Sequence, residues 1–402
     1  MAKAAMRTAL AKPEVDYGYI NARIRAMKSQ LFDRSFIESL LAMKSAEDVI
    51  AALGNTSYRG DIERGSVKYP GIAGIEEGLK DHLSTSYNKV VKVVGGNKEA
   101  SRLLNLLLGR WDLHNLRTVI RGKHSEATDE EIKSQLIPAG SLDEVTLTEL
   151  TKQPNVKACI DLLANWKVPY ARPLQEGFRL YLNTGNLADL EMSLDRFYYE
   201  FALAETEPRA LLGHSQSVRL VREFFKRKID FVNIMSALRL VKEHLAQELM
   251  KERASEGAVD FPAGGVSKRA GVKDKDQGHS GLARYFIDGG RELSVSRLVG
   301  LAMLPEVEDL VEALRGTSYG QTLGEGLKRF FETGSISVLE RIMEEGIIKS
   351  TVALFRQDPL NFSQIIAYLW AKFNEVVNLR IVLHGKAVGM QDDRIREALV
   401  LV

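Results

Sequence analysis

The chain has 402 residues, 45% hydrophobic and 27% charged, which suffices for two or three domain-sized units with ordinary globular cores. Its 55 basic and 53 acidic side chains give a net charge of +2. Nucleic-acid-binding domains usually carry a clear basic excess, so we expect no nucleic-acid partner. The single cysteine, Cys159, excludes an internal disulfide and fits a reducing compartment. No apolar run approaches the roughly 20 residues that span a bilayer, so we expect a soluble chain or one held on a membrane by a partner.

Helical periodicity dominates from one end of the chain to the other. Apolar residues recur at every third or fourth position in four segments, residues 35–53, 112–120, 187–205 and 336–355. Residues 88–96 are the best strand candidate, but their flanks have helical spacing. The pattern predicts an all-α fold.

One segment, residues 251–281, departs from this periodicity. It holds six glycines and eleven charged residues, and such a composition cannot bury enough apolar surface to order itself alone. We expect a long, mobile surface insertion here.

Residues 316–320, GTSYG, match the G-x-S-x-G pattern of a hydrolase nucleophile elbow around Ser318. Such an elbow needs a strand before the serine, whereas the preceding residues 305–316 have helical spacing. A related stretch, GNTSY at 54–58, lacks the pattern. The sequence therefore predicts a turn between two helices.

Internal repeats organise the whole chain. Residues 112–137 align without a gap with residues 375–400, and nine of the 26 positions are identical. A weaker third copy lies at 230–239. The copies share the pattern acid-apolar-x-Asn-apolar-x-x-apolar-apolar-base. Upstream, AALGNTSY at 51–58 matches EALRGTSY at 312–319, with NWKVPY at 165–170 as the middle version.

A Glu-Gly-apolar-base motif also occurs three times, around Gly78, Gly177 and Gly326. We therefore predict three homologous helical-bundle units arranged as a pseudo-threefold funnel. The predicted units are residues 1–140, residues 141–290 with the insertion 251–281, and residues 291–402.

The repeated acid and asparagine are the candidate site. In a helix they lie one turn apart at the edge of an apolar stripe. One interpretation is a structural clamp that joins helices within each unit, and the other is a ring of polar groups offered to a partner on the threefold axis. The candidate structural or interface residues are Asp112, Asn115, Arg117, Asp230, Asn233, Glu375, Asn378 and Arg380.

Motifs for other chemistry are not found. No histidine begins an HExxH zinc site, no phosphate-binding P-loop occurs, and one cysteine cannot build a cysteine-rich metal site. For His114 and His124, structural or surface roles are favoured over metal ligation. We expect no catalytic residue, metal, cofactor or small-molecule substrate.

Four segments carry a resemblance to a known family. Residues 16–32, 111–124, 130–143 and 374–386 are similar to the C subunit of archaeal and bacterial V/A-type ATPases, whose eukaryotic counterpart is the d subunit. The resemblance covers nearly the whole chain, is weak in the middle unit, and does not extend to the insertion.

The resemblance implies a non-catalytic rotor component on the cytoplasmic face of the membrane. Such a component receives the central shaft, made of the D and F subunits, in its mouth and rests on the ring of membrane c subunits. It transmits torque between ATP turnover and transport of protons or sodium. Two alternatives remain at this point: a helical-repeat scaffold that binds peptides outside any ATPase, and an enzyme with a site between the helical units.

Overall fold

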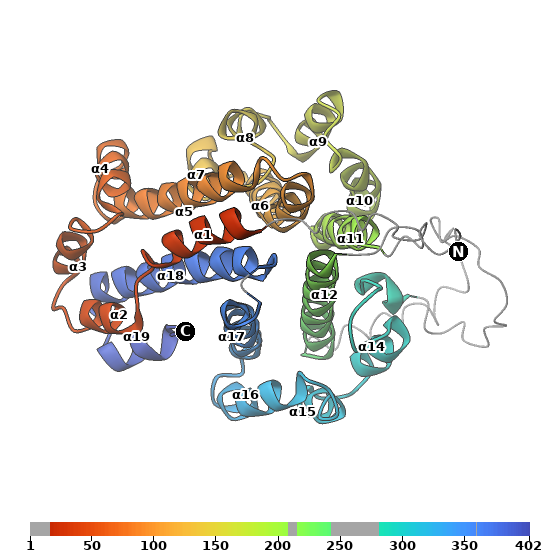
Figure 1. Cartoon of the computed structure of the whole chain (residues 1–402). Coiled ribbons are helices and arrows are strands. Elements are labelled where there is room, and N and C mark those ends of the chain that lie inside the picture. Colours follow the sequence, from red (N-terminus) through yellow and green to blue (C-terminus); the bar gives the residue numbers. More distant parts are fainter. Residues whose placement is uncertain (1–16, 208–214, 243–280, 359) are drawn as a thin grey trace, which may run out of the picture. The chain divides into compact units, whose positions relative to one another are not determined.

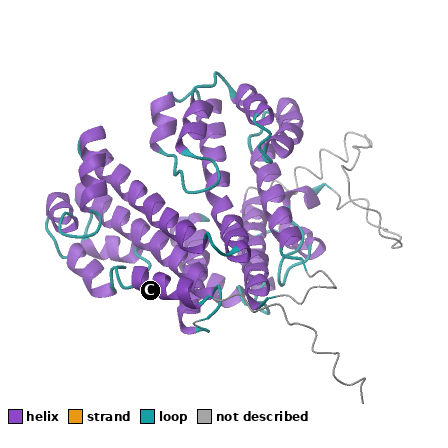
Figure 2. Cartoon of the chain, turned by 45° about the horizontal axis from the view of Figure 1, so that its top comes forward, coloured by secondary structure: helices purple, strands orange, loops and turns teal. Residues whose placement is uncertain are grey.

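The computed structural model describes residues 17–207, 215–242, 281–358 and 360–402. Helices, turns and loops make up these residues, and no strand occurs among them (Figure 2). The all-α prediction is confirmed, and residues 88–94 of the strand candidate belong to a long helix. The predicted insertion, 251–281, lies outside the described residues except for Gly281. Within the described ranges, no helix has both the length and the apolar character needed to traverse a bilayer.

One order of elements occurs three times: three short helices, two longer helices and a final short one (Figure 1). The first series is α2 (Arg34–Leu41), α3 (Ala46–Leu53), α4 (Arg59–Lys68), α5 (Ile72–Val94), α6 (Lys98–His124) and α7 (Asp129–Ser134). The second is α8 (Glu144–Thr151), α9 (Val156–Asn165), α10 (Ala171–Thr184), α11 (Ala188–Glu205), α12 (Gln216–Lys242) and η1 (Leu282–Tyr285). The third is α14 (Val295–Ala302), α15 (Val307–Ala313), α16 (Gly320–Thr333), α17 (Ser337–Val352), α18 (Ser363–Ala387) and α19 (Asp392–Ala398). Helix α1 (Gly18–Lys28) precedes the first series, and η2 (Ala353–Arg356) separates α17 from α18.

The first helix of each series begins at a side-chain cap. Asp33, Asp143 and Ser294 each accept a hydrogen bond from the backbone N–H three residues later. Such caps satisfy one of the four N–H groups that a helix start leaves unpaired. The cap therefore fixes where each series begins, and the first series begins at α2 rather than at α1.

By its internal contacts the chain divides into two compact units. Unit 1 comprises Met1–Tyr198, Pro208–Val221 and Ile347–Val402, and unit 2 comprises Tyr199–Glu207 and Arg222–Gly346. The divisions fall within α11, α12 and α17. The organisation into three units with boundaries after residues 140 and 290 stays a prediction.

Each unit has its own apolar core. In unit 1, α18 packs against α1, α2, α3 and α5, and α1, α5 and α18 lie side by side (Figure 1). Ile365, Ile366 and Leu379 of α18 are fully buried there. In unit 2 each of α12, α14, α15, α16 and α17 contributes one fully buried leucine to the core, and Leu314, directly after α15, is a sixth: Leu238, Leu298, Leu310, Leu314, Leu323 and Leu339.

The third helix of each series carries a buried glycine seven residues after the tyrosine that precedes the helix. These glycines are Gly65, Gly177 and Gly326. The sequence motif paired Gly78 with the latter two, and this alignment is wrong, because Gly78 lies on α5 and Gly65 is the counterpart. A Cβ at Gly65 would overlap backbone atoms of Gly74 and Gly78, so the glycine allows α4 and α5 to pack at backbone contact.

We expect Gly65→Ala to lower the free energy of unfolding by about 1–3 kcal/mol, because overpacking against rigid backbone forces the helices apart. Gly324→Ala is the matched control, since Gly324 lies in α16 with open space around the Cβ position. This control should raise stability by about 0.5–1 kcal/mol. Chemical denaturation of both variants measures the difference, and equal effects of the two substitutions would contradict the packing argument.

Candidate functional site

The three repeated asparagines make the same pair of hydrogen bonds. In each case Nδ2 donates to the carbonyl oxygen of one distant residue, and Oδ1 accepts from the backbone N–H of that same residue. The pairs are Asn115 with Ile137 (2.8 and 2.8 Å), Asn233 with Ile287 (2.7 and 2.8 Å) and Asn378 with Val400 (2.9 and 3.0 Å). A carboxamide carries one acceptor oxygen and an amino donor side by side, which suits this arrangement.

All three asparagines are buried, with exposed fractions of 0%, 0% and 3% for Asn115, Asn233 and Asn378. Each sits on the longest helix of its series and holds a residue two or three positions after the final short element. The paired residue is 22 positions away in the first and third copies and 54 positions away in the second. The additional length in the second copy coincides with the predicted insertion.

The acid one turn before each asparagine holds the next part of the loop. Asp112 accepts from the backbone N–H of Ser141 (3.0 Å), the Ser141 hydroxyl (2.7 Å) and the N–H of Leu142 (2.9 Å). Asp230 accepts from the N–H groups of Arg291 (3.0 Å) and Glu292 (2.8 Å). These donors lie four and five residues after the residue held by the asparagine. We call each acid, its asparagine and the segments they hold an acid–asparagine joint.

A glycine in each of the first two loops makes room for the aspartate. A Cβ at Gly140 would overlap Oδ1 of Asp112, and a Cβ at Gly290 would overlap Oδ1 of Asp230. Both glycines lie three residues after the residue that the asparagine pairs with. The two loops are therefore built alike, although the pairs 141–142 and 291–292 share no residue type.

In the third joint, the segment held by the acid comes from the N-terminal part of the chain, just before α2. Glu375 accepts from the backbone N–H of Phe32 at 2.6 Å, immediately before Asp33, the cap of α2. In the first two joints the acid likewise holds residues just before the caps Asp143 and Ser294. The third long helix thus connects to the first series without a covalent loop, and the whole contact lies within unit 1.

A tyrosine at the start of the third helix of the next series also approaches the acid. The Tyr319 hydroxyl donates to Asp230 at 2.9 Å, and the Tyr58 hydroxyl donates to Glu375 at 2.5 Å. Tyr170 has the same place in the series, and the Asp112 carboxylate contributes to raising the pKa of this tyrosine, after burial. The Ser-Tyr repeat is visible in the sequence. The contact of its tyrosine with the acid of a joint could not be predicted, because nothing in the sequence pattern connects the two residues.

The third joint contains further buried charged groups. The Lys372 ammonium donates to Glu375 (2.6 Å) and to the Tyr58 hydroxyl (3.0 Å), and burial lowers the Lys372 pKa. His82 stacks on Tyr58 with ring centroids 3.8 Å apart, and its Nδ1 lies 2.7 Å from Asp61. Burial, then the nearby Lys372 charge, lowers the pKa of His82 to about 4.

Burial raises the pKa of Asp112 and of Asp230, while the hydrogen bonds from the loop oppose this shift. The loop N–H groups therefore stabilise each carboxylate in place of the water it has lost. Within the described residues, no group of histidine, cysteine and acidic side chains is arranged to hold a metal ion. The joints connect helices to loops through buried hydrogen bonds, and the clamp interpretation of the candidate residues stays a prediction.

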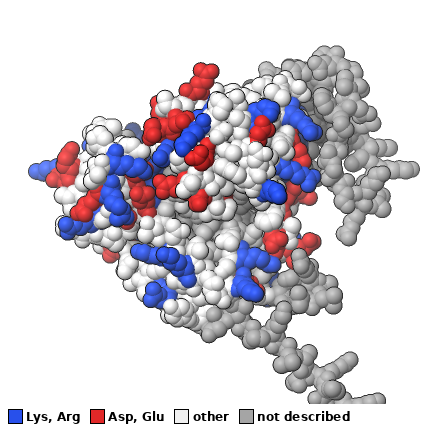
Figure 3. All heavy atoms as spheres, turned by 90° about the horizontal axis from the view of Figure 1, so that it is seen from above, with Lys and Arg blue, Asp and Glu red and all other residues white. Residues whose placement is uncertain are grey.

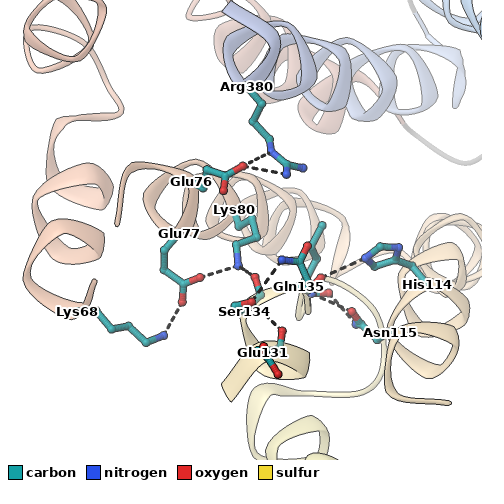
Figure 4. A network of polar contacts seen from close by, with 11 residues as sticks. Lys68, Glu76, Glu77, Lys80, His114, Asn115, Glu131, Ser134, Gln135 and Arg380 are labelled. Carbon is teal, nitrogen blue, oxygen red and sulfur yellow. Dashed lines mark hydrogen bonds and ion pairs between the residues drawn. The ribbon is translucent and has the colours of Figure 1, made fainter. Parts of the chain in front are cut away.

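The two candidate arginines follow their asparagines by two residues. Arg117 pairs with Asp195 on α11, where burial raises the pKa of Asp195 to about 6. Arg380 donates to Glu76 on α5 at 2.9 and 3.1 Å (Figure 4).

In the same region of unit 1, Glu77 lies between Lys68 (2.5 Å) and Lys80 (2.6 Å) (Figure 4). His114, which is adjacent to Asn115, lies 3.3 Å from the Gln135 carbonyl.

The repeated base, six residues after each asparagine, also has equivalent partners. It pairs with a glutamate on the fourth helix of the next series. The pairs are Arg121 with Glu191 (2.5 Å), Arg239 with Glu340 (3.3 Å) and His384 with Glu76 (2.7 Å). Such partly exposed pairs contribute about 0–1 kcal/mol, so they orient the helices more than they stabilise them.

Ser318 lies in the turn between α15 and α16, as predicted. Its N–H donates to Glu292 at 2.9 Å and its hydroxyl donates to the other oxygen of Glu292 at 2.6 Å. Helix α15 precedes the serine where a nucleophile elbow would have a strand.

Comparison with known proteins connects this architecture with a family. The model of the ATP synthase (C/AC39) subunit family matches residues 20–285 and 267–398. The chain belongs to the ATP synthase (C/AC39) subunit family. The resemblance inferred from the sequence motifs is thereby confirmed.

Individual relatives of this C/AC39-family chain align over nearly its full length. The C subunit of the A-type ATP synthase of Haloquadratum walsbyi is 27% identical over 94% of this chain and 96% of its own. The protein of the same name from Methanosarcina acetivorans is 29% identical over 96% of this chain and 93% of its own. The one from Methanocaldococcus jannaschii is 25% identical over 96% and 86%.

In this family member we expect Asn115→Ala, Asn233→Ala and Asn378→Ala each to lower the free energy of unfolding by about 1–3 kcal/mol. Each substitution leaves a buried N–H and C=O without partners. Asn183→Ala on the exposed side of α10 is the control and should change little. Denaturant unfolding measures the effects, which should be nearly additive for Asn115 and Asn233 because they lie in different joints. If all three variants keep the stability of the wild type but bind a partner more weakly, the asparagines belong to an interface and the clamp interpretation is wrong.

The low pKa of His82 predicts acid sensitivity. Between pH 6.5 and 4 the unfolded chain binds a proton at His82 that the folded chain does not, so stability falls as the pH falls. Protonation of His82 alone should lower the free energy of unfolding by about 2 kcal/mol between pH 7 and pH 5. His82→Gln should remove this part of the pH dependence of unfolding. His124→Gln, at an exposed site, should keep the pH dependence of the wild type. Urea unfolding at the two pH values tests this, and equal pH dependence of both variants would contradict it.

Proposed function

We propose that the chain is the central-stalk component of a V/A-type rotary ATPase or ATP synthase that joins shaft to membrane ring, without catalytic residues of its own. The observation that carries this proposal is the family match over nearly the whole chain, together with relatives named as the C subunit of A-type ATP synthases. In this role the chain is peripheral on the cytoplasmic face of the membrane. It connects the D and F subunits of the shaft to the ring of c subunits.

We further propose that the three series of helices form three units around a pseudo-threefold axis, as a funnel that receives the shaft. The repeated order of elements and the equivalent hydrogen bonds of the three joints support this arrangement. A protein that transmits torque must resist deformation under load. Dense helical cores and the buried hydrogen bonds of the three joints favour such stiffness.

The surface also suits a protein that is held in a complex by specific contacts. On the face drawn in Figure 3, basic and acidic side chains are interspersed rather than separated. A surface of mixed sign gives a partner local charge patterns to match, without long-range attraction for polyanions.

We expect the chain, affinity-tagged and extracted from native membranes in mild detergent, to copurify with the D, F and c subunits. In a strain without the chain, detached ATPase should retain hydrolysis, whereas ATP-driven proton or sodium pumping by inverted vesicles should be lost. Restoring the wild-type chain, but not an unrelated tagged helical protein, should restore pumping.

The result that would contradict this proposal is a folded, abundant chain that copurifies with none of these subunits. Full ion pumping in the strain without the chain would contradict it equally. Stable association with other proteins in place of the D, F and c subunits would favour the peptide-binding scaffold.

A further inference from the structure

A cavity of about 560 Å³ lies within unit 1 beside the third joint. Its walls come from the end of α1, the start of α2, the end of α17 with η2, the middle of α18, and residues 400–402. Glu375 and Asn378 of the joint form part of one wall. The volume is in the range of about 300–1,000 Å³ typical of small-molecule sites.

The lining of the cavity has more basic than acidic side chains, and one of the basic ones, Arg34, is exposed and also pairs with Glu38 at 2.8 Å. Lys28, Arg34, Lys349 and Arg356 contribute four cationic side chains from four elements. The carboxylates of the lining, Asp33 and Glu375, already accept hydrogen bonds from the chain.

Asp33 accepts from the Phe36 N–H and the Ser35 hydroxyl, both at 2.8 Å, and Glu375 accepts from the three donors of its joint. The Phe36 hydrogen bond lowers the pKa of Asp33. With four cationic side chains against these two carboxylates, the balance of charge in the lining favours an anion.

The rest of the lining is mostly apolar. Leu31, Val352 and Phe355 border the cavity together with Ile37 and Leu401. The Lys28 ammonium lies 4.0 Å above the Phe355 ring, which joins α1 to η2 across one side. An apolar lining with several cations matches a ligand that has a hydrocarbon body and an anionic head.

A buried polar side chain at this place departs from the repeat. The position four residues before the repeated asparagine is Trp111 in the first copy, Ile229 in the second and Asn374 in the third. Asn374 lines the cavity and is 2% exposed, and its Nδ2 donates to the Val400 carbonyl at 2.8 Å. Its Oδ1 has no donor among the described residues. Because a buried unpaired acceptor costs free energy, this oxygen marks a place for a water, and an anionic head, which has no donor, would lie away from it.

We propose that this cavity binds an anionic amphiphile. Its carboxylate or phosphate head lies among Arg34, Lys349 and Arg356, and its hydrocarbon chain lies against Leu31, Val352 and Phe355. The ligand bridges the α1–α2 segment, η2 and α18. It therefore braces the one joint that no covalent loop closes.

The test uses the full chain and dodecanoate below its micelle concentration, followed by calorimetric titration and thermal unfolding. We expect one dodecanoate per chain and a higher melting temperature. Neutral dodecyl maltoside and inorganic phosphate should not compete. Arg356→Glu and Arg34→Glu should each weaken binding by about tenfold or more, because attraction becomes repulsion.

Two further variants complete the test. Arg172→Glu is the matched control for Arg34→Glu, since each arginine makes an exposed pair with a glutamate four residues later, and Arg172 lies outside the cavity. It should bind dodecanoate normally. Ala353→Trp should fill the cavity from its apolar side and abolish binding without a change of charge.

Cosedimentation with phosphatidylglycerol vesicles, against phosphatidylcholine vesicles, separates the possible sources of the ligand. Selective binding to phosphatidylglycerol identifies a membrane lipid, and binding of dodecanoate alone identifies a free amphiphile. The proposal is overturned if dodecanoate shows no saturable binding. It is also overturned if Ala353→Trp binds as well as the wild type, or if phosphate displaces dodecanoate completely.

Discussion

The pairing of a buried asparagine with both backbone groups of one distant residue is the contact on which the rest of each joint depends. It fixes the loop after the final short element against the longest helix, within 3.0 Å at each bond. Only then do the next loop residues lie within reach of the acid one turn away. The acid in turn places the cap residue with which the following helix begins.

The same contact explains how the chain passes from one series of helices to the next. Asp112 and Asp230 hold the loops that lead into α8 and α14, and Glu375 holds Phe32 ahead of α2. The third joint lacks a covalent connection, and it is the one with the buried Lys372–Glu375 pair and the Tyr58–His82 stack. Removing one partner of such a buried pair typically costs about 3–5 kcal/mol, because the other charge is left buried without compensation.

Sequence alone predicted the helical class, the repeat and the repeated acid and asparagine, because these are side chains that recur at fixed spacing. The loop residues that these side chains hold could not be predicted from the sequence. They bond through backbone N–H and C=O groups, which almost every residue type has. Phe32 and Tyr58 were missed because their partner, Glu375, lies more than 300 residues away. Gly78 was misaligned with Gly177 because the two share the same short sequence motif, although they lie on different helices of the series and have different neighbours.

Hydrogen exchange of the native chain, followed by mass spectrometry, tests the central claim most directly. The backbone N–H groups of Ile137, Ile287 and Val400 are bonded to asparagine side chains outside any helix. We predict that they exchange slowly, with protection like that of the adjacent long helices, and that this protection is lost selectively on Asn→Ala substitution in the same joint. Exchange at the rate of exposed loops in the wild type would contradict the central role of the joints.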